Sequence, residues 1–312
     1  MSDKRILELA LAAAQQERDP QQPLLLLLSM SAMDVLGHTF GPSSWEAWDH
    51  LRRLDASLAT FLTSLEATVG PAGVILSGDH GNSAMPEARV PLPAYCNTDE
   101  ARSDAYDRPF CAAGARLEPN ALRAELRAAV ARSMGRSDLI AGVSDGYVFL
   151  TRAARALELP QRDALDRVVR GVLAQHAAEI AEVFHVGELA SRCPRVLAGA
   201  RGIPDRARPG EDLITLVCRS WADGAGAGDY FVVPAYGCFF DGEVVQGKGA
   251  SHGTPWLYDR TVPLFVRAPG AIDAGGLVVD PVDFSAYAAL EAALLGLDPR
   301  PAREILDALR AR

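Results

Sequence analysis

The sequence predicts a single α/β domain, and three observations support this fold class. A short apolar run, a long amphipathic stretch and a second short apolar run follow one another within residues 24–77. This strand–helix–strand order is typical of a βαβ unit, whose two strands lie parallel in one sheet. Helical and strand-like segments continue through the rest of the chain, and no repeat, low-complexity tract or linker divides residues 1–312. We therefore expect one α/β domain built on parallel strands.

The N-terminal third is expected to contain two helices and two strands. Residues 6–14 carry apolar side chains at helical spacing, and prolines at 20 and 23 end that helix. The leucine run at 24–28 is interpreted as a fully buried strand, followed by a loop at 29–42. Ser43 or Ser44 caps a helix whose apolar stripe, including Trp45 and Trp48 in the core, stops at Gly70. Residues 73–77 form the second strand.

The remaining elements follow an irregular surface excursion at about 82–118, which is rich in Pro, Asp and Arg. Further helices are expected at 120–133, 162–184, 285–295 and 302–309, and strands at 213–218, 230–234 and 262–266, with a glycine-rich polar loop at 241–254. The loop precedes an apolar strand, so its polar side chains are expected at a strand end.

Composition limits the class of partner. A formal charge of -9 and a pI near 5.2 argue against binding to a nucleic-acid duplex, because such proteins usually present a basic surface. The longest apolar run, 24–28, is too short to span a membrane, and no signal peptide is visible. The five cysteines lack a CxxC pair and are expected to be mostly buried thiols, with a Cys96–Cys111 bridge left open for an exported protein.

Metal-competent side chains follow both N-terminal strands. Asp34 and His38 come after the run at 24–28, and Asp79 and His80 come after the strand at 73–77. Because parallel strands end at one edge of a sheet, these four side chains are expected to converge. His252, in the loop before another strand, is a fifth candidate. Imidazole with carboxylate suits zinc, iron or manganese, and zinc is favoured for hydrolysis.

Three motifs together resemble the alkaline phosphatase superfamily, in the branch that joins bacterial alkaline phosphatases to nucleotide pyrophosphatase/phosphodiesterases. In chain order they are Asp34-x-x-Gly37-His38-x-x-Gly41-Pro42-x-Ser44, then Asp79-His80-Gly81, then Ser251-His252-Gly253 leading into Tyr258-Asp259-Arg260-x-Val262-Pro263-Leu264. Each motif alone is weak, whereas the combination and its order are specific. The resemblance covers about residues 5–295.

The resemblance implies an alkaline-phosphatase-like three-layer sandwich with a mostly parallel central sheet. It implies that Asp34, His38 and His252 bind one zinc and that Asp79 and His80 supply two ligands of a second, in a binuclear site. The activity implied is zinc-dependent hydrolysis of a small phosphate ester, by a phosphomonoesterase or phosphodiesterase. Members of the family are usually periplasmic or secreted.

The same resemblance leaves the nucleophile unassigned. It implies a first strand with a further aspartate ligand and a Thr or Ser nucleophile, well over a hundred residues before the Asp-x-x-x-His motif. Only 33 residues precede Asp34, so we expect a sandwich that is incomplete at its N-terminal side. The number of zinc ions stays open between the two of a complete site and one in this chain. Ser29, Ser31 and Ser77 are considered as substitute nucleophiles; Ser29 and Ser31 lie near the proposed ligands, but the resemblance implies an ordinary loop at that position.

Three hypotheses remain open at this stage. The first is a hydrolase subunit that needs a complementing N-terminal half or self-association. The second is a catalytically inactive pseudoenzyme that binds a metal or a partner, and the third is an intact hydrolase that uses water as its nucleophile. Asp259 and Arg260 are expected to be structural partners, and His50, His176 and His185 surface or helix-terminal groups, while Asn82 either lies near the metals or shapes a turn.

Overall fold

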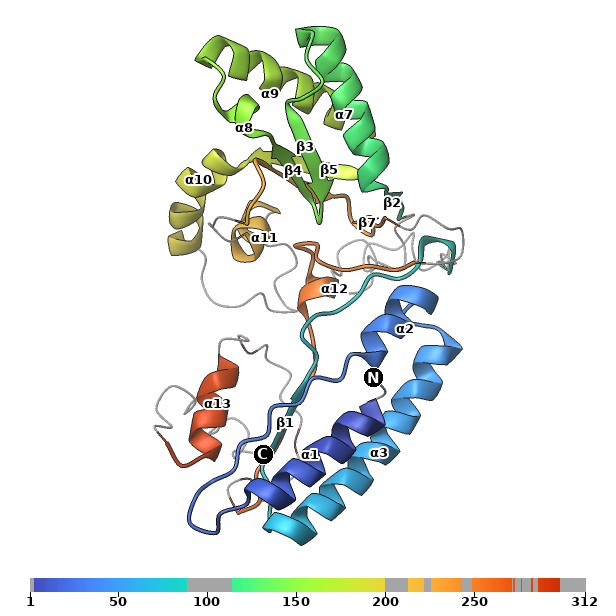
Figure 1. Cartoon of the computed structure of the whole chain (residues 1–312), viewed down its shortest axis with the longest axis vertical. Coiled ribbons are helices and arrows are strands. Elements are labelled where there is room, and N and C mark those ends of the chain that lie inside the picture. Colours follow the sequence, from blue (N-terminus) through green and yellow to red (C-terminus); the bar gives the residue numbers. More distant parts are fainter. Residues whose placement is uncertain are drawn as a thin grey trace.

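The computed structural model describes residues 3–88, 114–199, 213–221, 226–242, 249–270 and 286–297, together with residues 272, 276 and 282. Most of the expected excursion at 82–118, the Cys96–Cys111 pair, part of the loop at 241–254 and the expected helix at 302–309 lie outside these residues. Figure 1 shows the described elements in two groups, one around a four-stranded sheet and the other around the N-terminal helices, with α12 (Leu257–Arg260) between them.

The N-terminal group packs two long helices against each other beside a two-stranded sheet. Helix α1 (Asp3–Glu17) buries Leu7, Ala10 and Ala14 against Phe61 and Leu65 of α3 (Trp45–Val69). As expected, the Ser44 side chain caps α3 by accepting a hydrogen bond from the Ala47 N–H, and Gly70, at φ 92°, ends it. Strand β1 (Val74–Ser77) pairs antiparallel with β8 (Leu264–Arg267), and α13 (Ala286–Leu294) covers this ladder through Leu290.

The other group is a small three-layer arrangement around an antiparallel sheet. The strand order is β3 (Ile140–Ser144), β4 (Tyr147–Leu150), β6 (Tyr230–Pro234) and β5 (Ile180–His185). Helices α7 (Pro119–Met134) and α9 (Leu159–Leu173) cover one face, and α10 (Val186–Gly199) and α11 (Leu213–Ser220) cover the other. Side chains of β6 alternate between these two cores, as the two-residue period of a strand requires.

The remaining described elements are short. They are η1 (Pro86–Ala88), β2 (Arg116–Leu117), α8 (Arg152–Arg155), η2 (Ala174–His176) and β7 (Phe239–Phe240). Strands β2 and β7 run parallel and form the parallel pair among the strands that the structure describes. None of the described helices combines the length and the apolar composition needed to cross a bilayer.

The α/β class is confirmed, but the expected parallel unit is wrong. Residues 24–28 form no strand, and Leu25 and Leu27 are 48% and 71% exposed. No described strand lies in register with this run, so its leucines are not buried by pairing. The largest described sheet is antiparallel, where a mostly parallel central sheet was expected.

Several element assignments also need correction. The expected loop at 29–42 contains helix α2 (Ala32–Phe40). The expected helix at 162–184 ends at Leu173, because residues 180–185 join the sheet as β5. The expected strand at 213–218 is helix α11, and Trp45 and Trp48, expected in the core, lie on the outer face of α3 at 83% and 57% exposure.

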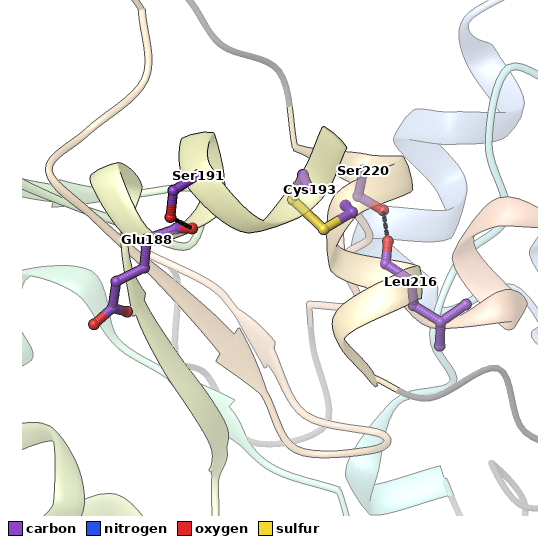
Figure 2. Close-up of a disulfide and its surroundings, with 6 residues drawn as sticks. Glu188, Ser191, Cys193, Leu216 and Ser220 are labelled. Carbon is purple, nitrogen blue, oxygen red and sulfur yellow. Dashed lines mark hydrogen bonds between the residues drawn. A yellow bond between two sulfur atoms is a disulfide. The ribbon is translucent and has the colours of Figure 1, made fainter. Parts of the chain in front are cut away.

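The cysteine prediction was wrong for one pair. Cys193 of α10 and Cys218 of α11 form a disulfide, which Figure 2 shows between the two helices. Both residues are 3% exposed and belong to the core on that face of the sheet. Cys238 is a buried cysteine outside this disulfide, as expected.

Candidate metal centre

Helix α2 places Asp34 and His38 on one face, because residues four apart are neighbours on a helix. The start of α2 is held by Asp3, a 4% exposed carboxylate that accepts hydrogen bonds from the Ala32 N–H at 3.3 Å and from His50 Nε2 at 3.0 Å. The helix ends at Gly41, whose φ of 88° favours glycine. His50 is therefore a partner of this carboxylate rather than a free surface group.

The loop after β1 carries Asp79 and His80 and passes very close to α12. The Gly81 N–H donates to the carbonyl oxygen of Asp259 at 2.8 Å. A Cβ atom at position 81 would lie 2.0 Å from the carbonyl oxygen of Tyr258, so only glycine fits without movement of the backbone. This contact explains the glycine of the Asp-His-Gly motif in steric terms.

A third segment, residues 249–254, brings His252 to the same place. It is fixed to α2 by two hydrogen bonds, from the Ala250 N–H to the His38 carbonyl at 3.0 Å and from His38 Nδ1 to the Ala250 carbonyl at 2.7 Å. It is fixed to the loop after β1 by Ser83, whose N–H and hydroxyl both donate to the Ser251 carbonyl. Three distant parts of the chain are thus joined by main-chain contacts.

Asp259 completes these connections, as expected for a structural partner. Its Oδ2 accepts hydrogen bonds from the N–H and the hydroxyl of Thr254, at 2.8 and 2.7 Å. Burial of this 3% exposed residue raises the pKa of its carboxyl to about 7, against the opposing effect of the Thr254 hydrogen bonds. The carboxyl therefore holds the loop that carries His252 through its hydrogen bonds with Thr254.

The five expected ligands lie together. Asp34 Oδ1 is 3.4 Å from His38 Nε2, 3.6 Å from His252 Nε2 and 3.8 Å from His80 Nε2. The Nε2 atoms of His38 and His252 are 3.2 Å apart, and the rings of His80 and His252 stack with centroids 3.4 Å apart. Asp79 lies at the rim, 88% exposed, with Oδ2 3.7 Å from His80 Nε2. Asp34, His38 and His252 have ligand atoms within 4.8 Å of one another.

The hydrogen bonding of this cluster fits a bound cation. His38 Nδ1 and His80 Nδ1 each donate to a backbone carbonyl, so in the neutral ring each Nε2 presents a lone pair. Asp34 Oδ1 has no solvent contact and no hydrogen-bond partner. A carboxylate oxygen and imidazole lone pairs that face one another repel unless a cation lies between them, and such donors are those that zinc prefers.

Burial and the neighbouring imidazole rings both lower the pKa of His252. Burial lowers the pKa of His252, and the nearby His80 and His38 rings lower this pKa further. The neutral imidazole, which is the form that binds metals, is therefore favoured at this position. Asn82 also lies at the site: its Oδ1 is buried without a hydrogen-bond partner, and a Cβ at position 37 would lie 3.0 Å from its Nδ2.

The sequence does not reveal every group that builds the centre. The carbonyl of Ala250 and the contacts of Ser83 were missed, because a backbone contact between distant segments leaves no mark in residue type. The hydroxyls once weighed as nucleophiles give no support for that role. Ser77 donates to the carbonyls of Gly78 and Pro263, and Ser29 and Ser31 are exposed.

The fold and this centre define an α/β protein with a cluster of histidine and carboxylate side chains that could hold a metal ion. The chain belongs to the type I phosphodiesterase/nucleotide pyrophosphatase family, whose model matches residues 2–183. This places it in the alkaline phosphatase superfamily, as the motif order indicates. Asp34, His38, Asp79 and His80 lie within the matched range, and His252 lies beyond it.

Individual relatives agree with this membership. The chain is 25% identical over 256 residues to alkaline phosphatase PhoK of Sphingomonas sp., which covers 79% of this chain and 39% of the relative. It is 26% identical over 259 residues to alkaline phosphatase PhoD of Zymomonas mobilis, and this match covers 80% of this chain and 38% of PhoD. The crystal structure of alkaline phosphatase PafA matches with a TM-score of 0.65 and 22% identity over 94% of this chain and 49% of that one. The chain thus spans less than half the length of these relatives.

Proposed function

We propose that this chain forms the metal-binding part of a zinc-dependent phosphate-ester hydrolase, acting on phosphomonoesters or phosphodiesters. The observation that carries the proposal is Asp34 Oδ1, a buried carboxylate oxygen that lacks any hydrogen bond and faces three imidazole nitrogens. Family membership supports the chemistry, because the relatives are phosphatases and phosphodiesterases by name. A chain with a charge of -9 also needs a local positive centre to attract a phosphate anion.

The residues have distinct roles in this proposal. Asp34, His38 and His252 hold one zinc, and Asp79 and His80 contribute to a second. When bound, the zinc pair supplies positive charge for the attacking and leaving oxygens of the displacement at phosphorus. The chain itself orients the ligands, since the Nδ1 bonds of His38 and His80 to backbone carbonyls fix both the tautomer and the ring direction.

We further propose that full activity requires a nucleophile supplied by a complementing N-terminal half or a second copy of the chain. Around the cluster, the described hydroxyls of Ser77 and Ser83 donate to carbonyl oxygens, and that of Thr254 donates to the Asp259 carboxyl, so each takes part in a contact that holds the site together. The exposed side chains of Leu24, Leu25, Leu27 and Leu28 support a docked polypeptide on this run.

The alternative is a pseudoenzyme that keeps the metal centre without catalysis. It is favoured by the same engaged hydroxyls. Hydrolysis assays separate the hydrolase from the pseudoenzyme. They use p-nitrophenyl phosphate and bis(p-nitrophenyl) phosphate, with the zinc-loaded chain alone and with the N-terminal portion of PhoK added. Hydrolysis that appears only after addition supports the hydrolase, whereas bound zinc without hydrolysis under either condition supports the pseudoenzyme.

Zinc binding itself is tested by titration calorimetry and metal analysis after dialysis. We expect His38→Ala and His252→Ala to lose binding. The matched control is His176→Ala, because His176 lies on η2 in the other group of elements and pairs with Glu125. Binding by His38→Ala as tight as that of the unmodified chain would remove the basis of the proposal.

We also infer that the protein works in an oxidising compartment, such as the periplasm or the cell exterior. The Cys193–Cys218 disulfide supports this inference, since such bonds form and persist mainly outside the cytosol. Fractionation of the native host with thiol labelling tests it. Recovery of the protein in the cytosol with both thiols reduced would contradict the inference.

A further inference from the structure

A crevice of about 390 Å³ opens beside the metal centre. His38 and His252 form part of its wall, and Phe231, Pro234 and Phe240 lie on other sides. The volume falls within the range of small-molecule sites, and the apolar lining is joined by the two imidazoles, one carboxylate and the hydroxyl residues Ser251 and Thr254. A phosphate ester held at the centre therefore has an adjacent space for its alcohol part.

The carboxylate belongs to Asp145, at the tip of the β3–β4 hairpin. Asp145 and Gly146 have φ values of 48° and 78° and lie between the paired residues Ser144 and Tyr147, which is the geometry of a two-residue type I′ turn. The turn is fixed to β6, because the Val232 N–H donates to the Gly146 carbonyl at 2.7 Å. Asp145 is thus placed at the crevice by a rigid turn rather than by a loose loop.

The chemistry of the wall selects by charge. The Ser144 hydroxyl donates to Asp145 Oδ2 at 2.7 Å, which leaves Oδ1 available to a ligand. A carboxylate here repels an anionic group and attracts a cationic one or a hydrogen-bond donor. Phe231 and Phe240 offer aromatic surface for a flat ring or an ammonium group. Phosphate and alcohol are thereby directed to opposite ends of the site.

We propose that this crevice binds the alcohol part of the phosphate ester and prefers neutral or cationic aromatic alcohols to anionic ones, with Asp145 as the residue that discriminates. The proposal rests on the proposed function, because it takes the phosphate end of the substrate to lie at the His38–His252 centre. It adds the substrate class: esters of aromatic alcohols without a second negative charge.

Binding of three phenols to the zinc-loaded full chain tests the proposal without any need for turnover. Tyramine, 4-ethylphenol and 3-(4-hydroxyphenyl)propionate share a ring and differ in charge, and their dissociation constants are measured by calorimetry or ligand-observed NMR. We expect tyramine to bind about tenfold more tightly than the propionate, from a change of two charge units beside a partly exposed carboxylate.

Variants locate the effect. Asp145→Asn, which keeps a residue favoured in type I′ turns, is expected to reduce the tyramine-to-propionate ratio below about threefold. Phe240→Ala is expected to weaken all three phenols while keeping their ratio. Asp138→Asn is the control, because Asp138 is an exposed acid paired with Arg136 in the same group of elements, and it should keep both affinity and ratio.

The outcomes separate this inference from the proposed function. Zinc binding without phenol binding, or an unchanged tyramine-to-propionate ratio in Asp145→Asn, refutes the proposed alcohol site and leaves the proposed metal site supported. If zinc does not bind, the proposed metal site is refuted. The phenol ratio measured on the metal-free chain then still tests the alcohol site, since its aromatic wall and turn do not depend on the metal.

Discussion

Replacing Asp34 by Asn should make the metal-free protein more stable while abolishing its response to zinc. In the metal-free chain at pH 8, above the ordinary pKa of an imidazole, Asp34 Oδ1 faces the Nε2 atoms of His38, His252 and His80 at 3.4, 3.6 and 3.8 Å without a hydrogen bond. An asparagine amide has the same shape and brings N–H donors to the lone pairs of His38 and His80, whose Nδ1 atoms donate elsewhere. The substitution thus satisfies a group that is unsatisfied without a cation.

The magnitude follows from the cost of that group. An unsatisfied buried acceptor destabilises by about 1–3 kcal/mol, and each kcal/mol shifts the melting temperature by roughly 2–4 °C for a chain of somewhat smaller size. We therefore expect Asp34→Asn to raise the Tm of the metal-free chain by roughly 2–12 °C. Zinc at a hundredfold excess over its Kd stabilises the unmodified protein by about 2.7 kcal/mol, and this increment should be missing from the variant.

Thermal unfolding followed by circular dichroism, in the presence of chelator or zinc, measures both effects. Asp49→Asn serves as control, because Asp49 is an exposed residue on α3 that pairs with Arg53, and its replacement should change little in either condition. A variant that is less stable than the unmodified chain in chelator and is still stabilised by zinc would refute the electrostatic argument and the assignment of Asp34 together.

Three further predictions concern the support of the site and the fold. Burial raises the pKa of Asp259 from 3.8 to about 7. Its contribution to stability is therefore complete below about pH 4 and is lost as pH rises through 7, by up to about 4 kcal/mol. Urea unfolding of the metal-free chain should show this decline in the free energy of unfolding, and Asp259→Asn should make that free energy less dependent on pH. The double change Cys193→Ser and Cys218→Ser opens a closure of 25 residues in sequence and should cost about 3 kcal/mol, with dithiothreitol affecting the unmodified chain alone. Gly81→Ala places a Cβ 2.0 Å from a carbonyl oxygen, so this change should destabilise the fold by about 1–3 kcal/mol and weaken zinc binding. Gly171→Ala is the control, because its Cβ meets open space and the change should be neutral or stabilising. Denaturation and zinc titration of both variants measure the two effects.

Local signals in the sequence were sufficient where the structure is itself local. Helix α3 was predicted with its cap at Ser43 or Ser44 and its end at Gly70, because both signals act within a turn of the helix, and the structure has the cap at Ser44. Strand β6 was predicted from its apolar run, and all five residues are buried. The Asp145–Gly146 pair between two apolar runs is a strong hairpin signal, and the hairpin was nevertheless missed.

The failures occurred where burial depends on distant partners. A short apolar run fits either a strand or a buried helix segment by periodicity alone. Residues 213–218 form a helix packed on α10 through the disulfide. Of the run at 24–28, Leu26 packs against the α1–α3 core and the other four leucines remain exposed, because no described strand pairs with them. The sequence contains the hydrophobicity of both runs, but their environment is decided by segments elsewhere.

The candidate centre was anticipated in its residues and not in its construction. The order of three motifs brought Asp34, His38 and His252 into one hypothesis, and the structure places their ligand atoms within 4.8 Å of one another. The expected route, two parallel strands ending at one edge, is wrong, because α2 and a single strand carry the first four residues. Metal binding by these residues stays a prediction until it is measured.

The construction has a consequence for how the centre responds to its cation. His38 and Ala250 lie 212 residues apart in sequence and are joined by two hydrogen bonds, so the centre exists only when α2 and the 249–254 segment are docked. A cation that binds this docked state and not the separated one must stabilise the docking by linkage. Metal binding and the docking of α2 on the 249–254 segment are therefore linked, and hydrogen exchange at the Ala250 N–H should slow in proportion to zinc occupancy.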